Sequence, residues 1–254
     1  MLVVHADAAT VAEAAAARIL LRLVDAQAAR GTASVVLTGG GMGSSMLEAV
    51  ARSSLQGTVD WSRVDVWWGD ERFLPSGHPD RNETQARAAL LDQIPLDPAR
   101  VHPMPASDSV HTEPERAAQA YARDLALAAR PEDHGPVPPF DLLILGLGED
   151  GHVASLFPEQ PALYEEAPVA AVRGAPKPPP LRITLTLPAI RSALHVAVVA
   201  AGAGKATAAR LALGGAGYVQ VPAAGVHGKN STLWLIDRAA ASKLPRGLDR
   251  LSSP

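Results

Sequence analysis

The chain has 254 residues, of which 47% are hydrophobic, with no cysteine and a formal net charge of −3. That length and hydrophobic content suffice for one large α/β domain with a core of its own. The slightly negative charge gives no electrostatic footprint for nucleic acid or an anionic membrane, and a chain without cysteine forms neither disulfides nor a thiolate nucleophile. We therefore expect a small-molecule partner, no nucleic acid and no membrane.

The N-terminal segment gives no sign of a targeting sequence. It lacks the basic region and the long apolar run of a signal peptide, and Glu13, Arg18 and Arg22 interrupt its most apolar part. The sequence shows no internal repeat, which argues against a solenoid. We expect a soluble cytoplasmic protein in which residues 1–254 form one domain.

The first quarter of the chain predicts a helix, a strand and a second helix. Asp7 can cap a helix over residues 8–30, a β-rich run covers 34–37, and a further helix is expected over 46–55. A glycine-rich loop, residues 38–45, joins that strand to the second helix. This alternation is typical of an α/β fold.

The loop of residues 38–45 begins with Thr38, Gly39, Gly40 and Gly41. A strand, a glycine loop and a helix in this order place free backbone N–H groups and the positive helix end around an anion, so a phosphate would fit there. The same glycines could equally make only a tight turn. No GK[ST] follows them, which disfavours a nucleoside triphosphate.

A charged segment follows the next predicted strand, residues 64–68. Asp70, Glu71 and Arg72 stand where that strand ends, and charge is costly there unless it is paired or functional. Arg72 suits bidentate contact with a phosphate or carboxylate. A solvated turn with an internal Asp–Arg ion pair would explain these residues equally well.

The middle of the chain predicts connecting structure. We expect a loop over 73–81, a helix over 82–91, irregular Pro-rich chain over 92–113 and a helix over 113–130. The histidines of this region have no metal-ligand spacing with one another or with His152, and we expect them at the surface or at caps: His78, His102, His111 and His134.

The stretch from Phe140 onward is the most informative part of the sequence. An apolar run of buried-strand length, residues 140–145, stops abruptly at the glycine-rich loop 146–152. Such a loop lies at the carboxyl edge of a sheet, where open α/β folds bind ligands. Because Asp150 and His152 stand two residues apart among glycines, the loop indicates a site rather than a turn.

Other chemistries fit this loop less well. Its glycines spell GxGxxG, as in dinucleotide-binding sites, but Pro158 interrupts the helix that such a site requires. No serine stands in GxSxG, and neither metal-ligand spacing nor a carboxylate cluster is found. What remains is a metal-free acid/base site on His152, which Asp150 can orient. A lone histidine is more often structural, so the neighbouring motifs must decide.

The last third of the chain predicts more strands with cationic residues beside them. A short strand is expected over 169–173, a β-like run over 181–187 with Arg182 near its start, and a buried strand over 194–201. Lys205 follows at the start of a helix, where the dipole disfavours a cation. A bound anion would explain this lysine, although chance placement on the surface would do so too.

A final strand is expected over 231–236, with a short helix after Asp237. Together with 34–37, 64–68, 140–145 and 194–201 this makes roughly five strands alternating with helices. The pattern predicts a doubly wound, mostly parallel, Rossmann-like sheet with a small β-containing insertion near 165–187. The glycine, acidic and imidazole loops would then gather on one edge.

Several segments resemble, in order and over nearly the whole chain, the motifs of 6-phosphogluconolactonases. The longest match is residues 146–158 with the signature GxGxDGHxASLFP. The other matches are Thr38–Gly41 with S/T-G-G, Gly69–Arg72 with GDER, Arg182–Thr184 with R-I-T, Gly204–Ala206 with GKA, and the segment from Leu233, with Trp234 and Asp237, with W-x-x-D-x-x-A. The resemblance implies the fold shared with glucosamine-6-phosphate deaminase.

The resemblance also implies hydrolysis of 6-phospho-D-glucono-1,5-lactone to 6-phospho-D-gluconate in the oxidative pentose phosphate pathway, with no metal and no cofactor. His152 would be the base that activates water, and Asp150 would support it. The residues implied in substrate and phosphate binding are Thr38, Gly39, Gly40, Gly41, Asp70, Arg72, Gly148, Arg182 and Lys205. We expect a monomer or a weak homodimer.

The sequence departs from the family where the first loop usually continues Ser-Thr-Pro, because this chain has Gly41, Met42, Gly43 and Ser44 there. Contact with phosphate would then pass to a nearby hydroxyl or to backbone. Two alternatives stay open. In the deaminase the DGH motif continues toward Asn-Glu-Pro, whereas Ser155 and its neighbours supply no acid here. A non-catalytic sugar-phosphate sensor on the same fold would be expected to carry a DNA-binding region or to lack the histidine.

Overall fold

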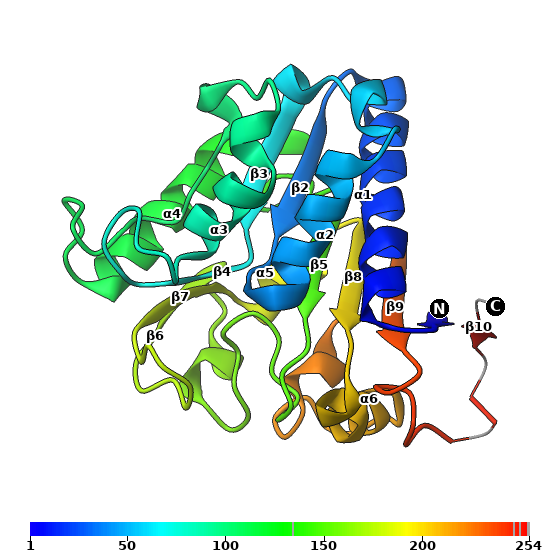
Figure 1. Cartoon of the computed structure of the whole chain (residues 1–254). Helices are drawn as coiled ribbons and strands as arrows, with labels where there is room; N and C mark the ends of the chain where they lie inside the picture. Colours follow the sequence, from blue (N-terminus) through cyan, green and yellow to red (C-terminus); the bar gives the residue numbers. More distant parts are fainter. Residues whose placement is uncertain (134, 246, 249, 253–254) are drawn as a thin grey trace.

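The computed structural model describes residues 1–254 except 134, 246, 249, 253 and 254, so His134 lies outside the described residues. Its main sheet has the strand order β10-β1-β9-β8-β5-β2-β3, and all neighbouring strands are parallel (Figure 1). The strands are β1 (Leu2–His5), β2 (Ala33–Leu37), β3 (Val64–Trp68), β5 (Leu142–Gly146), β8 (His195–Ala200), β9 (Ser231–Asp237) and β10 (Leu251–Ser252).

The order of the strands places a crevice between β2 and β5. From β2 the chain moves outward to β3, and from β5 it moves outward in the other direction to β8 and β9. In an open α/β sheet the loops separate at such a reversal, and ligands bind beyond the carboxyl ends of the strands there. The glycine loop after β2 and the acid/imidazole loop after β5 flank this position, as the sequence predicts.

Helices cover both faces of the sheet, as alternate residues of β5 show. Leu142 and Ile144 belong to a hydrophobic cluster with α1, α2 and α3, whereas Leu143 and Leu145 belong to a second cluster with α4, α5 and α6. The predicted doubly wound fold is thereby confirmed. The helices are α1 (Ala8–Arg30), α2 (Gly40–Arg52), α3 (Asn82–Ala89), α4 (Pro114–Ala128), α5 (Leu187–Arg191) and α6 (Ala206–Leu213).

A small antiparallel sheet lies near the carboxyl ends of the main strands, at the lower left of Figure 1. It has the order β4-β7-β6, with β4 at Asp70–Arg72, β6 at Val169–Val172 and β7 at Arg182–Leu185. The insertion near 165–187 is therefore confirmed. The alternative of a solvated turn at residues 70–72 is wrong, because these residues pair with β7 and form a strand.

Two other boundaries differ from the sequence-based prediction. α2 begins at Gly40 rather than near residue 46, because the glycines form its first turn against the end of β2. A Cβ on Gly43 would lie 2.5 Å from the carbonyl oxygen of Thr38. The expected helix after Asp237 is wrong, since that segment forms turns, in which the N–H of Ala240 donates to the Asp237 carboxylate at 2.7 Å. The short terminal strands β1 and β10 were not predicted, because neither has a clear alternating pattern.

The histidines of the middle segment have local roles. Nδ1 of His78 accepts a hydrogen bond from the N–H of Asp80, as expected of a capping residue. His102 is more buried than expected, because its ring stacks on Trp67 at 3.8 Å and its Nε2 lies 3.1 Å from Asp65. No helix in the described part of the chain is long and apolar enough to cross a membrane.

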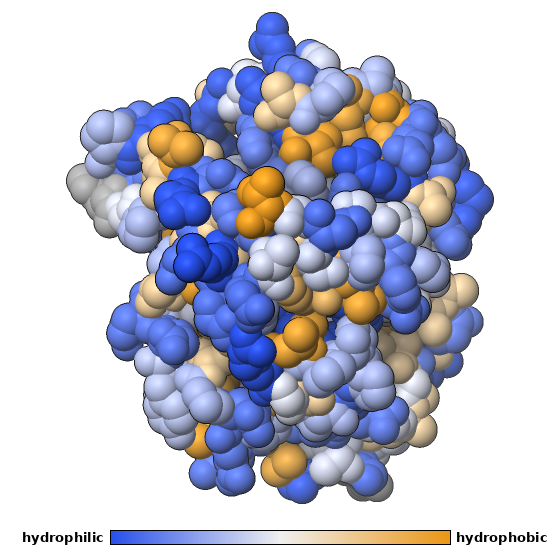
Figure 2. All heavy atoms as spheres, turned by 90° about the vertical axis from the view of Figure 1, so that its left-hand side faces the viewer, coloured by the Kyte–Doolittle hydropathy of each residue, from blue (hydrophilic) through white to orange (hydrophobic). Residues whose placement is uncertain are grey.

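Figure 2 shows the side of the molecule that carries α4 and the small sheet. Hydrophobic residues on it form small separate groups among hydrophilic ones. The large apolar side chains with the highest exposure in the described chain are Val110 and Leu127, at 90% and 85%. Scattered exposed apolar residues of this kind are normal on a protein surface.

Asp141 joins α1, β2 and β5. Its carboxylate accepts the N–H of Ser34 at 2.9 Å and also binds the guanidinium of Arg30. We expect Asp141→Ala to lower the free energy of unfolding by about 2–3 kcal/mol, since a buried N–H loses a charged partner. Urea denaturation would measure this change. Glu13→Ala, which removes only an exposed ion pair, is the control, and equal unfolding midpoints for the two variants would contradict the prediction.

Candidate active site

A cavity of about 860 Å³ opens at the carboxyl edge of the main sheet, beside the small sheet. Its walls come from the segments after β2, β5 and β8 and from β4 and β7. The cavity brings together every binding residue predicted from the sequence, together with His152: Thr38, Gly39, Gly40, Gly41, Asp70, Arg72, Gly148, Arg182 and Lys205. Asp150 does not line the cavity, but its carboxylate contacts Nδ1 of His152.

His152 and Asp150 form a close imidazole–carboxylate pair. Nδ1 of His152 lies 2.5 Å from Oδ1 of Asp150, which also accepts the His152 backbone N–H at 3.3 Å. Burial raises the pKa of Asp150, but the hydrogen bonds and charge of His152 outweigh it and lower the pKa to about 2. Because an ionised Asp150 can only accept a hydrogen bond, Nδ1 of His152 is the donor in this contact. Nε2 is then the ring nitrogen left for a general base.

The loop that carries this pair is folded back on itself over Gly148. The N–H of Gly148 donates to the carbonyl oxygen of His152 at 2.8 Å. A Cβ at Gly148 would lie 1.9 Å from Nδ1 of His152 and 2.4 Å from Oδ1 of Asp150. Only glycine leaves room for the pair at this place. The ring of Phe157 packs 4.6 Å from that of His152 and fixes its other side.

Positive charge gathers in the cavity although the chain as a whole is slightly negative. Arg72, Lys177, Arg182 and Lys205 line it, together with the carboxylates of Asp70 and Asp237, described below. Arg72 and Arg182 stand directly opposite each other in the β4–β7 pair, an arrangement that repels unless an anion lies between or beside them. This local excess of cations favours an anionic ligand.

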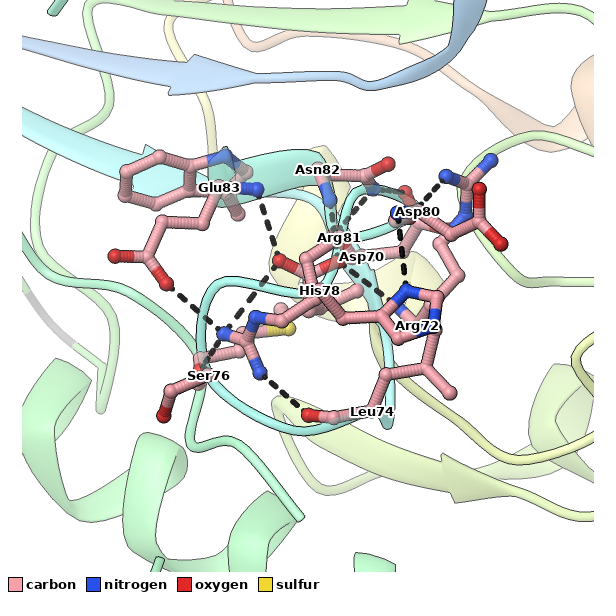
Figure 3. Close-up of polar contacts among 12 residues, drawn as sticks. Asp70, Arg72, Leu74, Ser76, His78, Asp80, Arg81, Asn82 and Glu83 are labelled. Atoms are coloured by element: carbon pink, nitrogen blue, oxygen red, sulfur yellow. Dashed lines mark hydrogen bonds and ion pairs between the residues drawn. The ribbon is translucent and has the colours of Figure 1, made fainter. Parts of the chain in front are cut away.

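Arg72 retains donors for such a ligand. Its Nη1 donates to the carbonyl oxygen of Asp80 at 2.6 Å, whereas its buried Nε has no hydrogen-bond partner among the described residues (Figure 3). Burial lowers the pKa of Arg182; Asp70 opposes this effect, and Arg72 adds to it. Two partly desolvated guanidinium groups side by side are strong binders of phosphate or carboxylate.

The carboxylates of the cavity wall hold neighbouring segments in place. Asp70 accepts the hydroxyl of Ser155 at 2.6 Å and the side-chain N–H of Asn82 at 3.3 Å, instead of forming the Asp–Arg pair of a solvated turn. Asp237 accepts the N–H of Gly202 at 3.0 Å, and thereby fixes the turn that presents Lys205. Both carboxylates therefore act on the shape of the site.

Sequence reasoning did not single out Lys177 and Asn82, although both line the cavity. Lys177 lies in the proline run 174–180, which Arg182 holds by donating to the carbonyl oxygens of residues 177, 178 and 179 at 3.0–3.1 Å. Part of the Arg182 guanidinium is thus used within the protein. One signal for Lys177 was available in the sequence: this lysine stands in a proline run, five residues before Arg182, which was already a predicted site residue. Asn82 gave none beyond its position at a helix start.

The fold and this cavity define an α/β protein with a cation-rich cavity at the carboxyl edge of its sheet. Residues 6–234 match the model of the family described as glucosamine-6-phosphate isomerases/6-phosphogluconolactonase. The chain belongs to this family, which confirms the resemblance found in the sequence motifs.

Relatives and solved structures agree with this placement. A 6-phosphogluconolactonase of Streptomyces coelicolor is 60% identical over 249 residues, covering 97% of this chain and 95% of the relative. The Mycobacterium tuberculosis protein of that name is 47% identical over 241 residues, covering 94% and 96%. The structure of 6-phosphogluconolactonase from Trypanosoma brucei has a TM-score of 0.83 at 28% identity, covering 96% and 98%. A monomeric glucosamine-6-phosphate deaminase, with a TM-score of 0.76 at 19% identity over 96% and 100%, shares the fold.

Proposed function

We propose that this cavity hydrolyses 6-phospho-D-glucono-1,5-lactone to 6-phospho-D-gluconate, a step of the oxidative pentose phosphate pathway. The observation that carries the proposal is the His152–Asp150 pair at the wall of a cavity rich in cations. High identity to relatives named 6-phosphogluconolactonase over almost the full chain supports the same substrate. The enzyme class is a carboxylic ester hydrolase acting on a lactone.

His152 acts as the base on water. Its Nε2 takes a proton while the water oxygen bonds to the lactone carbonyl carbon, and the carbonyl oxygen becomes an oxyanion. A cavity cation or backbone N–H stabilises that charge. When the intermediate collapses, the bond from the carbonyl carbon to the ring oxygen breaks, and the proton on His152 moves to that oxygen. Asp150 keeps the ring oriented and stabilises its cationic form, as its lowered pKa allows.

The phosphate lies between Arg72 and the start of α2 in this proposal. The glycines of residues 39–41 form the N-terminal end of that helix, where backbone N–H groups and the helix dipole favour an anion. Backbone donors would replace the hydroxyl that the family usually supplies where this chain has Gly41 and Met42. Lys205 and the part of Arg182 not bound to the proline run would contact the remaining oxygens of the substrate.

The deaminase alternative is less well supported. The fold match at 19% identity says nothing about the reaction. Where the deaminase motif continues toward Asn-Glu-Pro, this chain has Ser155, Leu156, Phe157 and Pro158, none of them an acid, and the hydroxyl of Ser155 is buried against Asp70. No acid from that segment reaches His152.

The test is the decay of freshly generated 6-phosphogluconolactone with and without the protein, in buffer containing a chelator. Decay well above the spontaneous rate is expected, with 6-phosphogluconate as the product. Glucosamine 6-phosphate, offered separately, should release no ammonia. Decay at the background rate would overturn the proposal, because a δ-lactone also opens in water alone.

The lowered pKa of Asp150 makes a prediction about stability. The folded-state pKa of about 2 lies below the ordinary value of 3.8, so ionised Asp150 stabilises the fold above about pH 4, and this contribution is lost as the pH falls toward 2. The stability advantage of wild type over Asp150→Asn should therefore shrink as the pH falls from about 4 toward 2. Urea unfolding across that range would measure it, and an advantage that grows on acidification would contradict the assignment.

We also infer that the protein acts in the cytoplasm as a single domain, as a monomer or weak homodimer, without nucleic acid. Its overall charge of −3 supports the last point. Light scattering over a range of protein concentrations would test the oligomeric state.

A further inference from the structure

Glu71 lies in the middle of β4 but faces away from the cavity. Its neighbours Asp70 and Arg72 both line the cavity, and alternate side chains of a strand point to opposite faces. The side chain of Glu71 is fully buried on the side of α3. A buried carboxylate between two cavity residues needs a reason, because burying an unpaired charge is costly.

Its partners are backbone N–H groups on both sides of the 73–81 loop. Oε1 of Glu71 accepts the N–H of Arg72 at 2.8 Å and of Asn82 at 2.6 Å, and Oε2 accepts the N–H of Glu83 at 3.0 Å. The residue at the N-cap position of α3, Arg81, makes no side-chain cap of its own. Glu71 therefore caps α3 from a distant strand and ties both ends of the loop to β4.

Arg81 supports this carboxylate from within the same loop. Its guanidinium lies 3.6 Å from Oε2 of Glu71 and is almost fully buried. It also donates to the carbonyl oxygens of Leu74 at 3.2 Å and Met104 at 2.8 Å, and to Glu83 at 3.1 Å (Figure 3). The planar fork of arginine reaches these groups together, which a lysine would not do.

The residues held in this way, Arg72 and Asn82, line the cavity. The guanidinium of Arg72 donates a hydrogen bond to the carbonyl oxygen of Asp80, the residue before Arg81. The side chain of Asn82 donates to the carbonyl oxygen of Asp70 at 2.8 Å. Moving the loop relative to β4 would therefore misplace both Arg72 and Asn82.

We propose that Glu71 and Arg81 are a pair of positioning residues that holds Arg72 and Asn82 in the geometry that binds the phosphorylated substrate. Neither touches the substrate. This inference rests on the proposed function and adds to it the residues that set substrate affinity from outside the cavity. A purely structural cap would change stability and leave substrate affinity alone, so the two roles can be separated.

The test compares Glu71→Gln with Glu83→Gln. The amide at position 71 keeps the shape but offers one acceptor oxygen in place of two, and its NH₂ group faces a backbone N–H or Arg81. Because a displacement near 1 Å can cost up to about a hundredfold, we expect KM for the lactone to rise about tenfold or more, with kcat within about twofold. Glu83→Gln also removes a carboxylate from Arg81 but accepts no N–H of the site segments, and should leave KM unchanged.

Binding of 6-phosphogluconate by calorimetry supplies a second readout, with each variant shown to be folded by circular dichroism. Its dissociation constant should rise with KM in Glu71→Gln. Wild-type KM and product affinity in a folded but less stable Glu71→Gln would overturn the inference. If Glu71→Gln does not fold, Arg81→Lys decides: raised KM supports the inference, and wild-type KM overturns it. If wild type neither binds the product nor accelerates lactone decay, the proposed function itself has failed.

Discussion

His152→Ala is expected to lower kcat for lactone hydrolysis by about 10²–10⁴-fold, the usual contribution of a general base, with little change in KM. The reason is the geometry of the pair: Nδ1 is bound to Asp150, so Nε2 is the ring nitrogen available to water. Without the imidazole, water must attack the lactone unassisted, and the remaining rate above background reflects binding and oxyanion stabilisation. In the proposed mechanism other residues hold the substrate, which is why KM should change little.

The measurement is the decay of fresh lactone, corrected for the spontaneous rate, over a range of substrate concentrations. His111→Ala is a matched control, because it removes a histidine that does not line the cavity. Thermal unfolding should show that His152→Ala remains folded, since the side chain is at the cavity wall and 18% exposed. A fully active His152→Ala protein would remove His152 from the mechanism and leave the base to be found elsewhere in the cavity.

Arg72→Ala is expected to raise KM by about 10–100-fold with a smaller effect on kcat. Loss of a charge-assisted contact to a buried anion costs about 1.5–3 kcal/mol, which corresponds to this range. Arg72 is chosen because its Nε is buried without a partner among the described residues and its side chain is held at the cavity wall by Asp80. Because its Nε is not engaged by the protein, Arg72 can bind an anion without first giving up an internal ion pair.

Arg72→Lys separates charge from shape. It keeps the positive charge but loses the two-pronged geometry, so KM should fall between wild type and Arg72→Ala. Arg173→Ala, which removes an exposed arginine paired with Glu113 and Glu115, should leave KM at the wild-type value. If Arg72→Ala and Arg173→Ala gave equal KM values, the phosphate would have to be placed at Lys177, Arg182 or Lys205 instead.

Much of the site could be predicted because its motifs stand directly after strands. The run 140–145 and the loop that carries Asp150 and His152 are adjacent in sequence, so a buried strand was enough to place the loop at the sheet edge. The loop after β2 and the residues after β3 follow the same rule. Parallel strands bring such segments to one edge whatever their separation in the chain.

Other features depended on partners far away in sequence. Residues 70–72 form a strand because β7 pairs with them, and no pattern within three residues predicts that. The start of α2 moved to Gly40 because the glycines pack closely against the end of β2, although glycine is a poor helix former. Tertiary packing outweighed local propensity in both places.

By itself the sequence determined the alternation of strands and helices, the edge of the sheet where the site lies, and the pairing of an acid with an imidazole in one loop. These are local properties, set by hydrophobic runs, glycines and residues two positions apart. Only the tertiary structure decided that Ser155 holds Asp70, that Arg182 shares its guanidinium with the proline run carrying Lys177, and that Glu71 caps α3. Hydrogen bonds of this kind join segments that meet only when the chain has folded, because a buried polar group binds whichever partner the packing brings within reach.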